Sequence, residues 1–370
     1  MTPAPGDESS DRTWGPELDE LRSRGVLAEN MGGEEKVQRQ HDRGKLDVRQ
    51  RIEALLDAGS FHEIGKIAGT PTYDGEGNLA DLRASNFVFG RGRIDDRTVV
   101  VAADDFTVRG GAADASIITK QIAAEQMALE LRLPLIRLID GTGGGGSVKT
   151  LDSDPKKQSE NSTGASGRGA RTYVPANPGW EHVVANLATV PVVALCLGPV
   201  AGLGAARAVS SHYSVMVRGL SQLFVAGPPV VNRLGLEEVD KEGLGGSSIH
   251  TRNGAVDDEV ASEEEAFESA RRFLSYLPSS VHELPERGPA TDDPQRTDDS
   301  LLDVVPRDRR QVYRMRDILE SVLDQGSFFE MGARFGRSAI TGLARLDGWP
   351  VAVLAGDPYH YGGGWTAAAS

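Results

Sequence analysis

Part of this sequence is repeated, and the repeat limits the folds that the chain can adopt. Residues 55–65 read LLDAGSFHEIG and residues 322–332 read VLDQGSFFEMG, with Leu, Asp, Gly, Ser, Phe, Glu and Gly in common. Residues 93–111 (RIDDRTVVVAADDFTVRGG) align with residues 345–363 (RLDGWPVAVLAGDPYHYGG) in the same order along the chain. Two matches in one order indicate two copies of one domain. The alternative is a chance similarity between strands and turns of like composition.

The repeat and the composition divide the chain into four parts. Residues 1–33 are acidic, rich in Pro and Gly and weakly periodic, so we expect a mobile arm. A first domain is expected over 34–282, followed by a linker over 283–300, where nearly every residue is charged or a turn former. Residues 301–370 begin the second copy, which reaches only the position equivalent to residue 118. We therefore expect an incomplete second domain.

Apolar strands alternate with helical patterns between residues 86 and 277, which predicts an α/β fold with buried strands. Strands are expected over 86–89, 98–103, 134–139, 192–197 and 213–217. Helices are expected over 34–56, 114–131, 180–187, 205–211 and 263–277. The 20 uncharged residues 187–206 have the length of a membrane span. Their two prolines and three glycines favour a buried strand, turn and helix instead, so we expect no membrane segment.

Charge and cysteine content exclude several classes of protein. The chain has 54 acidic against 40 basic residues, a net charge of −14, and no basic block of the kind that follows phosphates, so no nucleic-acid partner is expected. The single cysteine, Cys196, excludes disulfides and favours a cytoplasmic protein. Because Cys196 lies in an apolar strand, we expect a buried, inert thiol. The acidic N-terminus has no apolar core, so no secretory signal is expected.

Three glycine-rich loops each follow an expected strand, at residues 110–112, 143–146 and 202–204. Glycine lets the backbone approach a ligand closely, and free N–H groups at a helix start favour developing negative charge. Such donors, without a strong side-chain base beside them, suit the oxyanion of an enolate or a thioester. The alternative is a set of tight turns that pack for their own sake.

The sequence gives little support for a dinucleotide site, a metal site or a serine hydrolase site. Residues 141–146 match the dinucleotide fingerprint G-x-G-x-x-G, but no helical pattern follows them, and the run 202–207 ends in Arg207 where glycine or alanine is required. The seven histidines and one cysteine show no metal-ligand spacing, so no metal is expected. His212 and His250 are isolated, which favours surface or hydrogen-bonded core positions over catalysis. No G-x-S-x-G elbow supports a serine hydrolase.

Seven segments resemble the carboxyltransferase (β) subunits of biotin-dependent acyl-CoA carboxylases, a family that includes the propionyl-, methylcrotonyl- and acetyl-CoA carboxylases. The segments are GKLDVRQRIEALLDAGSF (44–61), DFTVRGGAADAS (105–116), PLIRLIDGTGG (134–144), GPVAGLGAARAVSSHYSVMV (198–217), LFVAGPPVV (223–231), LGGSSIH (244–250) and FLSYLP (273–278). They keep the family's order, and SAITGLARLDGWPVAV (338–353) is similar to the start of its second domain.

This resemblance implies two crotonase-like domains built of ββα repeats, which agrees with the repeat found in the sequence. It implies that a carboxyl group is transferred from carboxybiotin to the α-carbon of an acyl-CoA, through an enolate held in backbone oxyanion holes. The biotin would be carried by a biotin carboxylase or carrier subunit, and no cofactor or metal would bind this chain directly. The active site would form between subunits of a homo-oligomer, with dimers assembled into a hexamer.

Carried over by position, the resemblance places the first oxyanion hole on the N–H groups of Gly202 and Leu203, with Gly204 beside them. The family usually has a second glycine where this chain has Leu203, and that side chain could narrow the pocket. Ala206 stands where related hydratases have a glutamate, which argues against water addition. The residues expected to bind the acyl-CoA are Gly110, Gly111, Ala112, Gly143 and Gly144.

Two alternatives stay open. The first is the carboxyltransferase subunit of a biotin-dependent acyl-CoA decarboxylase, which runs the transfer backwards. The second is a non-catalytic module that binds acyl-CoA or assembles with full-length subunits, because the second copy lacks a counterpart of the turn at 198–204. For a chain that ends at Ser370 we expect weak acyl-CoA binding and little carboxyl transfer.

Overall fold

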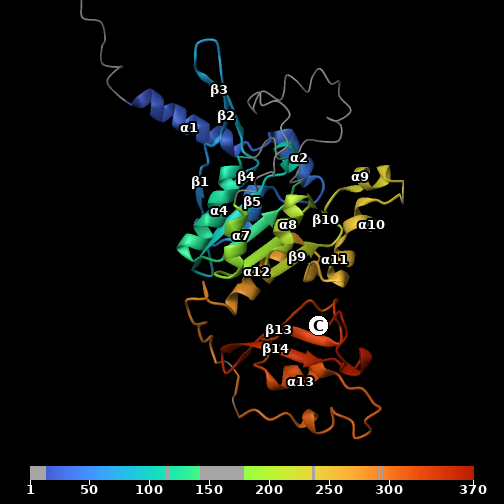
Figure 1. The fold of residues 1–370 in the computed structure, drawn as a ribbon. Coiled ribbons are helices and arrows are strands. Elements are labelled where there is room, and N and C mark those ends of the chain that lie inside the picture. Colours follow the sequence, from blue (N-terminus) through green and yellow to red (C-terminus); the bar gives the residue numbers. More distant parts are fainter. Residues whose placement is uncertain (1–13, 113–116, 142–178, 236–237, 291, 294) are drawn as a thin grey trace, which may run out of the picture.

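The computed structural model describes residues 14–112, 117–141, 179–235, 238–290, 292–293 and 295–370. Its centre is a seven-stranded sheet with the order β1-β4-β5-β6-β7-β9-β11 (Figure 1). The strands β1, β4 and β5 pair antiparallel, whereas the strands from β5 to β11 pair parallel. The bounds are β1 His62–Ile64, β4 Phe87–Ile94, β5 Arg97–Asp104, β6 Leu135–Ile139, β7 Val192–Cys196, β9 Tyr213–Val217 and β11 Asp258–Val260.

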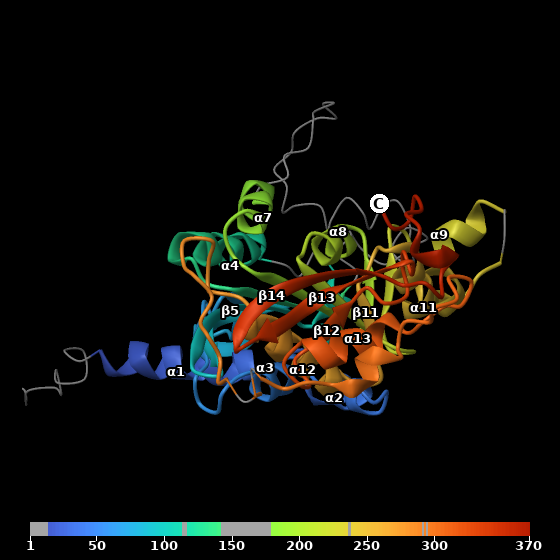
Figure 2. The same cartoon turned by 90° about the horizontal axis from the view of Figure 1, so that it is seen from below.

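Helices cover both faces of this sheet (Figure 2). On one face lie α4 (Ile118–Leu131), α7 (Trp180–Leu187) and α8 (Leu203–Val209), and on the other lie α3 (Val48–Leu55) and α12 (Glu263–Ser275). Alternate residues of β7 therefore enter different cores: Val193 and Leu195 pack with α3 and α12, while Ala194 and Cys196 pack with α8. All residues of β6, β7 and β9 are buried, as expected for parallel strands covered on both sides. The predicted α/β fold with buried strands is confirmed.

The single helical pattern expected over 34–56 is two helices in the structure, α2 (Glu34–His41) and α3. Between them Gly44 has a φ of 72°, in the left-handed region that favours glycine. Asp47 then starts α3 with a capping box, because its carboxylate accepts from the Gln50 N–H and the Gln50 side chain accepts from the Asp47 N–H.

Residues 15–29, which we expected to belong to a mobile arm, form the helix α1 (Gly15–Glu29). Ala28 of this helix packs on Leu82 and Ala84 of β3 (Leu79–Ala84), which pairs with β2 (Gly69–Tyr73) in a hairpin. Most of α1 is polar, and only Ala28 is buried, so the sequence carries too little apolar periodicity to reveal it.

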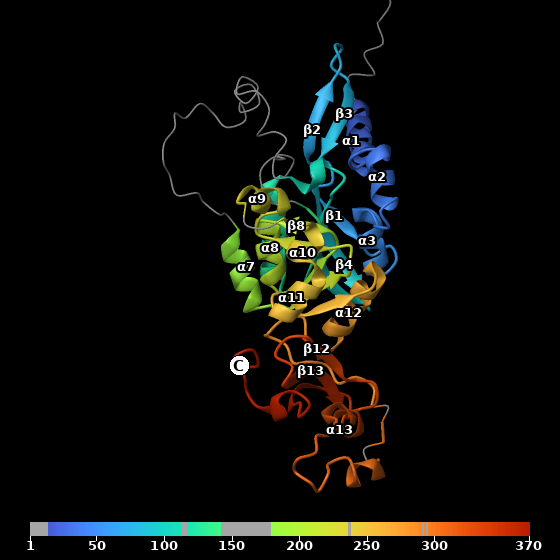
Figure 3. The ribbon, with the colours of Figure 1, turned by 90° about the vertical axis from the view of Figure 1, so that its right-hand side faces the viewer.

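The second copy repeats the fold of the start of the first. Helix α13 (Met315–Val322) precedes the antiparallel sheet β12-β13-β14, just as α3 precedes β1-β4-β5 (Figure 3). Its strands are β12 Phe329–Met331, β13 Ala339–Leu346 and β14 Trp349–Gly356. In each copy a 3-10 turn follows the third of these strands, with η2 at Arg109–Gly111 and η5 at Tyr361–Gly363.

Equivalent hydrogen bonds hold the two copies. The carboxylate of Asp57 accepts from the N–H groups of Asp95 and Asp96 in the turn between β4 and β5, at 3.1 and 2.9 Å. Asp324 accepts in the same way from the turn between β13 and β14, at 2.9 and 2.7 Å. Ser60 Oγ accepts from the Arg93 N–H, and its counterpart Ser327 Oγ accepts from the Arg345 N–H. The repeat predicted from the sequence is therefore present in the structure.

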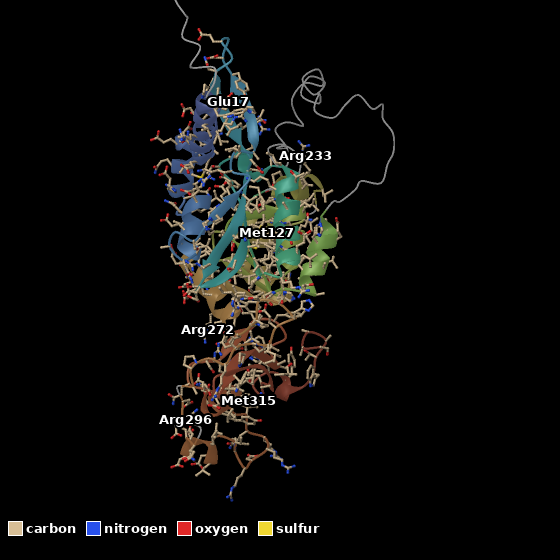
Figure 4. All side chains as sticks on the ribbon, turned by 90° about the vertical axis from the view of Figure 1, so that its left-hand side faces the viewer. Glu17, Met127, Arg233, Arg272, Arg296 and Met315 are labelled. Atoms are coloured by element: carbon tan, nitrogen blue, oxygen red, sulfur yellow. The ribbon has the colours of Figure 1, made fainter. Side chains whose placement is uncertain are left out.

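The second copy packs on the first through aromatic rings. Phe329 of β12 lies with its ring centroid 5.3 Å from that of Tyr213 and 6.2 Å from that of Tyr276. Arg272 of α12, labelled at this junction in Figure 4, donates to the carbonyls of Gly326 and Phe328 at 3.1 and 2.7 Å. Between α12 and the 3-10 turn η4 (Asp299–Leu302), the described residues form no helix or strand.

The remaining elements are short and surround the carboxyl end of the parallel strands. They are β8 Pro199–Ala201, β10 Gln222–Phe224, α9 Pro228–Arg233, α10 Lys241–Gly245 and α11 Ser247–Asn253. The uncharged residues 187–206 run through β7, β8 and the start of α8. Across the described ranges, no helix has both the length and the apolar character needed to cross a bilayer.

The shared turn chemistry predicts equal losses of stability in the two copies. We expect Asp57→Ala and Asp324→Ala each to lower the free energy of unfolding by about 1–2 kcal/mol, because each removes a charged acceptor from two backbone N–H groups. Urea denaturation measures both. Asp19→Ala, which removes only an exposed ion pair with Arg22, is the control and should change stability by less than about 0.5 kcal/mol. A loss for Asp324→Ala no larger than that control would contradict the assignment.

Candidate active site

Three loops meet at one edge of the sheet, where β5, β6 and β7 end. The first is η2, the second starts at Gly141, and the third is Gly202 with the start of α8. A side-chain carbon on Gly111 would lie 2.6 Å from the Cα of Gly141. From the third loop, the Ala201 N–H donates to the Gly141 carbonyl at 3.3 Å. Parallel strands end at the same edge of a sheet, so the Gly141 backbone lies between the other two loops.

The structure brings several predicted site residues to this edge. Gly204 faces Gly141, since a side-chain carbon on Gly204 would lie 3.7 Å from the Gly141 carbonyl oxygen. Ala112 is buried, and its carbonyl accepts from Asn86 Nδ2 at 2.7 Å, which fixes the end of η2 against the sheet. Two other predicted residues, Gly143 and Gly144, lie outside the described residues.

Gly202 supports the third loop in a way that the sequence did not predict. Its φ of 64° and ψ of −127° suit glycine alone. Its N–H donates to the Phe224 carbonyl of β10 at 3.1 Å, so this donor is used within the fold. This corrects the expectation that Gly202 supplies an oxyanion donor. Among the described residues, the N–H groups of Leu203 and Gly204 have no acceptor, and they are the candidate donors that remain.

A buried ion network centred on Asp140 lies at the end of β6. Asp140 is fully buried, and its Oδ2 pairs with Lys45 Nζ and, at 2.8 Å, with Arg51 Nη1. Arg51 Nη2 pairs with Glu263 Oε1 at 2.5 Å and donates to the Leu197 carbonyl at 2.8 Å. Removing one charge would leave another buried without its partner. The network therefore fixes the end of β6, directly before Gly141.

This network could not be predicted from the sequence, because its members are scattered along the chain from Lys45 to Glu263. The only signal was a charged residue, Asp140, directly after an apolar strand. Burial lowers the pKa of Lys45, even though the carboxylates of Asp140 and Glu263 oppose that shift. The Lys45 ammonium also lies 4.9 Å from the ring centroid of Phe106, at the start of the loop that leads to η2.

A basic groove of about 650 Å³ opens beside η2. Lys36, Arg39 and Arg43 line it from α2 and the turn that follows, and Arg109 and Gly110 line it from η2. The spacing of three and four positions along α2 puts its cations on one side of the chain. Positive charge gathers here although the net charge of the whole chain is −14. Such a groove suits a ligand with several negative charges, such as phosphates.

The isolated histidines and the cysteine lie where the sequence predicts. His212 Nδ1 accepts from the Val192 N–H at 3.1 Å, and His250 Nε2 lies 2.8 Å from the Leu223 carbonyl oxygen. Cys196 is fully buried in β7, and that burial raises the pKa of its thiol to about 12, so it is inert as predicted. In the part of the chain that the structure describes, no group of His, Cys, Asp and Glu side chains is arranged to hold a metal ion.

A family model for the carboxyl transferase domain matches residues 39–370. The chain belongs to the carboxyl transferase domain family. The match covers α3, the whole parallel sheet, and the second copy, so it includes every loop of the candidate site. The family resemblance inferred from the sequence is confirmed.

Two relatives of this chain are longer than it is. The propionyl-CoA carboxylase carboxyltransferase subunit of Haloferax mediterranei is 33% identical over 342 residues, which cover 92% of this chain and 62% of that protein. The mitochondrial propionyl-CoA carboxylase beta chain of Homo sapiens is 31% identical over 331 residues, which cover 88% of this chain and 58% of that protein. This chain thus spans about three fifths of the length of these relatives.

A solved relative shows the same fold. The crystal structure of transcarboxylase 12S, described as a hexamer assembly with methylmalonyl-coenzyme A and methylmalonic acid bound, superposes with a TM-score of 0.78. It is 27% identical, and the superposition covers 95% of this chain and 65% of that one. The crotonase-like α/β fold expected from the sequence is confirmed.

The ion network predicts that Arg51 is essential to the stability of this carboxyl transferase domain. We expect Arg51→Met to lower the free energy of unfolding by about 3–5 kcal/mol, because it leaves the buried carboxylate of Glu263 without the cation that pairs with it and that of Asp140 with Lys45 alone. Denaturation in urea measures the loss. Arg22→Met, which removes an exposed arginine from α1, should cost less than about 1 kcal/mol. Equal effects of the two substitutions would contradict the assignment.

The burial of Asp105 predicts that the stability of the folded chain depends on pH. Burial raises the pKa of this carboxyl to about 6, although the N–H and hydroxyl of Thr107 both donate to it. Its pKa in the folded chain is therefore above its ordinary value of 3.8, and the folded chain binds more protons at this site between those values. The contribution of Asp105 to the free energy of unfolding is therefore most favourable below about pH 4, and it is lost as the pH rises through about 6.

We expect Asp105→Asn to remove this loss, since the amide oxygen can still accept from Thr107. The variant should gain up to about 3 kcal/mol over the unmodified chain at pH 7, and much less at pH 4. Urea denaturation at both pH values measures the difference. A difference between variant and unmodified chain that is the same at both pH values would contradict the assignment.

Proposed function

We propose that this chain forms the acyl-CoA side of a carboxyltransferase, which moves a carboxyl group from carboxybiotin to the α-carbon of an acyl-CoA. The proposal is carried by one observation: the basic groove opens beside η2, which packs on Gly141, and the Gly141 backbone contacts the loop that holds the candidate donors. Gly110 belongs to the wall of the groove, and its neighbour Gly111 packs on Gly141. One extended ligand can therefore place phosphates on Arg39 and Arg43 while its thioester reaches the other loops.

The chemistry of this site would come from the backbone. The thioester oxygen would accept from the N–H groups of Leu203 and Gly204, and these bonds strengthen as negative charge develops on the enolate. The buried ion network holds the end of β6, where the Gly141 carbonyl accepts from the Ala201 N–H of the donor loop, so the donors need not reorganise during the reaction. When carboxybiotin is bound, its ureido group supplies both the CO2 and the base that takes the α-proton.

We propose two kinds of partner, a biotin-bearing carrier protein and further copies of this chain. Support comes from the relatives, which are subunits of propionyl-CoA carboxylases, and from transcarboxylase 12S, which was solved as a hexamer assembly. Biotin would thus reach the site on another protein and not as a cofactor held by this chain.

Carboxyl transfer tests the proposal in the reverse direction. With the purified chain, we expect a slow loss of methylmalonyl-CoA that depends on added free biotin and is measured by chromatography of the CoA esters. Isothermal calorimetry with propionyl-CoA separates binding from chemistry. No binding of propionyl-CoA would overturn the assignment of the acyl-CoA site, whereas binding without biotin-dependent loss would support the non-catalytic alternative.

The basic groove predicts that the phosphate groups of the acyl-CoA, and not its acyl-pantetheine part, are bound through charge. Arg39→Ala/Arg43→Ala should weaken propionyl-CoA binding by about tenfold or more, because charge-assisted hydrogen bonds to phosphates are lost. The same double variant should leave the affinity for propionyl-pantetheine, which lacks the nucleotide phosphates, unchanged. Arg22→Ala/Arg93→Ala removes two partly exposed arginines away from the groove and is the charge-matched control. An equal loss for both double variants would contradict the groove assignment.

A further inference from the structure

A small cavity of about 50 Å³ lies beside Leu203, between α4, α7 and α8. The Leu203 side chain is half exposed at this point, at 50%. Much of the lining is apolar, from Ile118, Ile122, Trp180, Val183 and Leu203. The volume is close to that of one or two water molecules in the liquid, at roughly 30 Å³ each, so the cavity has room for one or two carbon atoms.

The two charged residues in the wall of this cavity, Glu125 and Arg207, are held by other groups. Glu125 is paired with the buried Arg137 through two bonds of 2.8 Å, and it accepts from Asn186 Nδ2 at 3.0 Å. The Arg207 guanidinium faces Asp104 at 3.6 Å and lies over the ring of Phe87. These side chains are therefore fixed walls and not free acids or bases.

The cavity cannot widen on the side of α7, because the start of α7 packs closely on α4. A side-chain carbon on Gly179, the residue before α7, would lie 2.9 Å from Ile122 Cγ1 of α4. Val183 is 4% exposed and packs within the fold. Helices in such close contact resist separation, because packed interiors transmit strain instead of yielding. Leu203 and Ile118 are the half-exposed apolar members of the lining, at 50% and 49%, and of these two only Leu203 carries a candidate donor N–H.

We propose that Leu203 selects the length of the acyl chain, with the cavity beside it taking the one or two carbons beyond the α-carbon. This inference rests on the proposed function, in which the Leu203 N–H binds the thioester oxygen. The same residue then places its side chain next to the acyl group. Propionyl and butyryl chains fit the cavity, and a hexanoyl chain exceeds it. Discrimination per methylene in such a pocket is about 10- to 200-fold.

Substitutions of opposite size at Leu203 test the proposal. Calorimetric titration with CoA and with acetyl-, propionyl-, butyryl- and hexanoyl-CoA gives a chain-length profile for each variant. Leu203→Ala should raise the affinity for hexanoyl-CoA relative to propionyl-CoA by about tenfold or more. Leu203→Phe should lower the affinity for propionyl-CoA relative to acetyl-CoA by a similar factor. Both variants keep the backbone N–H, and binding of CoA without an acyl group should be unchanged.

Val209→Ala is the matched control, because Val209 is 49% exposed on the same helix and does not line the cavity. It should leave the profile unchanged. If CoA and acyl-CoAs bind but the two Leu203 variants keep the profile of the unmodified chain, the role of Leu203 is overturned and the proposed function stands. If the unmodified chain binds no acyl-CoA, the proposed function fails and this inference with it.

Discussion

The guanidinium of Arg51 connects the helices and strands on which the fold and the candidate site depend. Arg51 of α3 reaches Asp140 at the end of β6, Glu263 at the first turn of α12, and the carbonyl that follows β7. It thus links two helices of one face to two central strands of the sheet. Burying these charges is costly, and the cost is recovered only while every partner is in place. The interior and the candidate active site are therefore coupled, since Asp140 is both a member of the network and the residue before Gly141.

Much of the fold could be predicted from the sequence, because its determinants are local. The strand at 213–217 and the helix at 180–187 are found at the predicted residues, since each is a short apolar or amphipathic run with turn residues on both sides. The repeat predicted a second copy, and the structure shows the same turn hydrogen bonds at Asp57 and Asp324. Burial of Cys196 followed from its position in an apolar strand.

The candidate site was predictable only as a set of loops. The sequence identified Gly111 and Gly204 as loop residues, but not Gly141 as the backbone between them. It assigned Gly202 a donor role, because a residue pattern does not reveal that the Phe224 carbonyl already accepts from it. The ion network and the basic groove join residues that are distant in sequence, and no local pattern contains that information. Helix α1 was missed for a related reason, since its only buried residue, Ala28, packs on a distant hairpin.

The hairpin of β2 and β3 marks a connection at which this fold accepts inserted residues. From Gly65 to Arg93 the first copy takes 28 positions, whereas from Gly332 to Arg345 the second takes 13. The hairpin, at residues 69–84, occupies the additional length, yet β4 pairs with β5 as β13 pairs with β14. A duplicated unit that accepts 15 extra residues at one connection without a change in strand pairing has a natural position for insertions. Divergence between members of such a family can accumulate at this connection, while the sheet that carries the chemistry keeps its geometry.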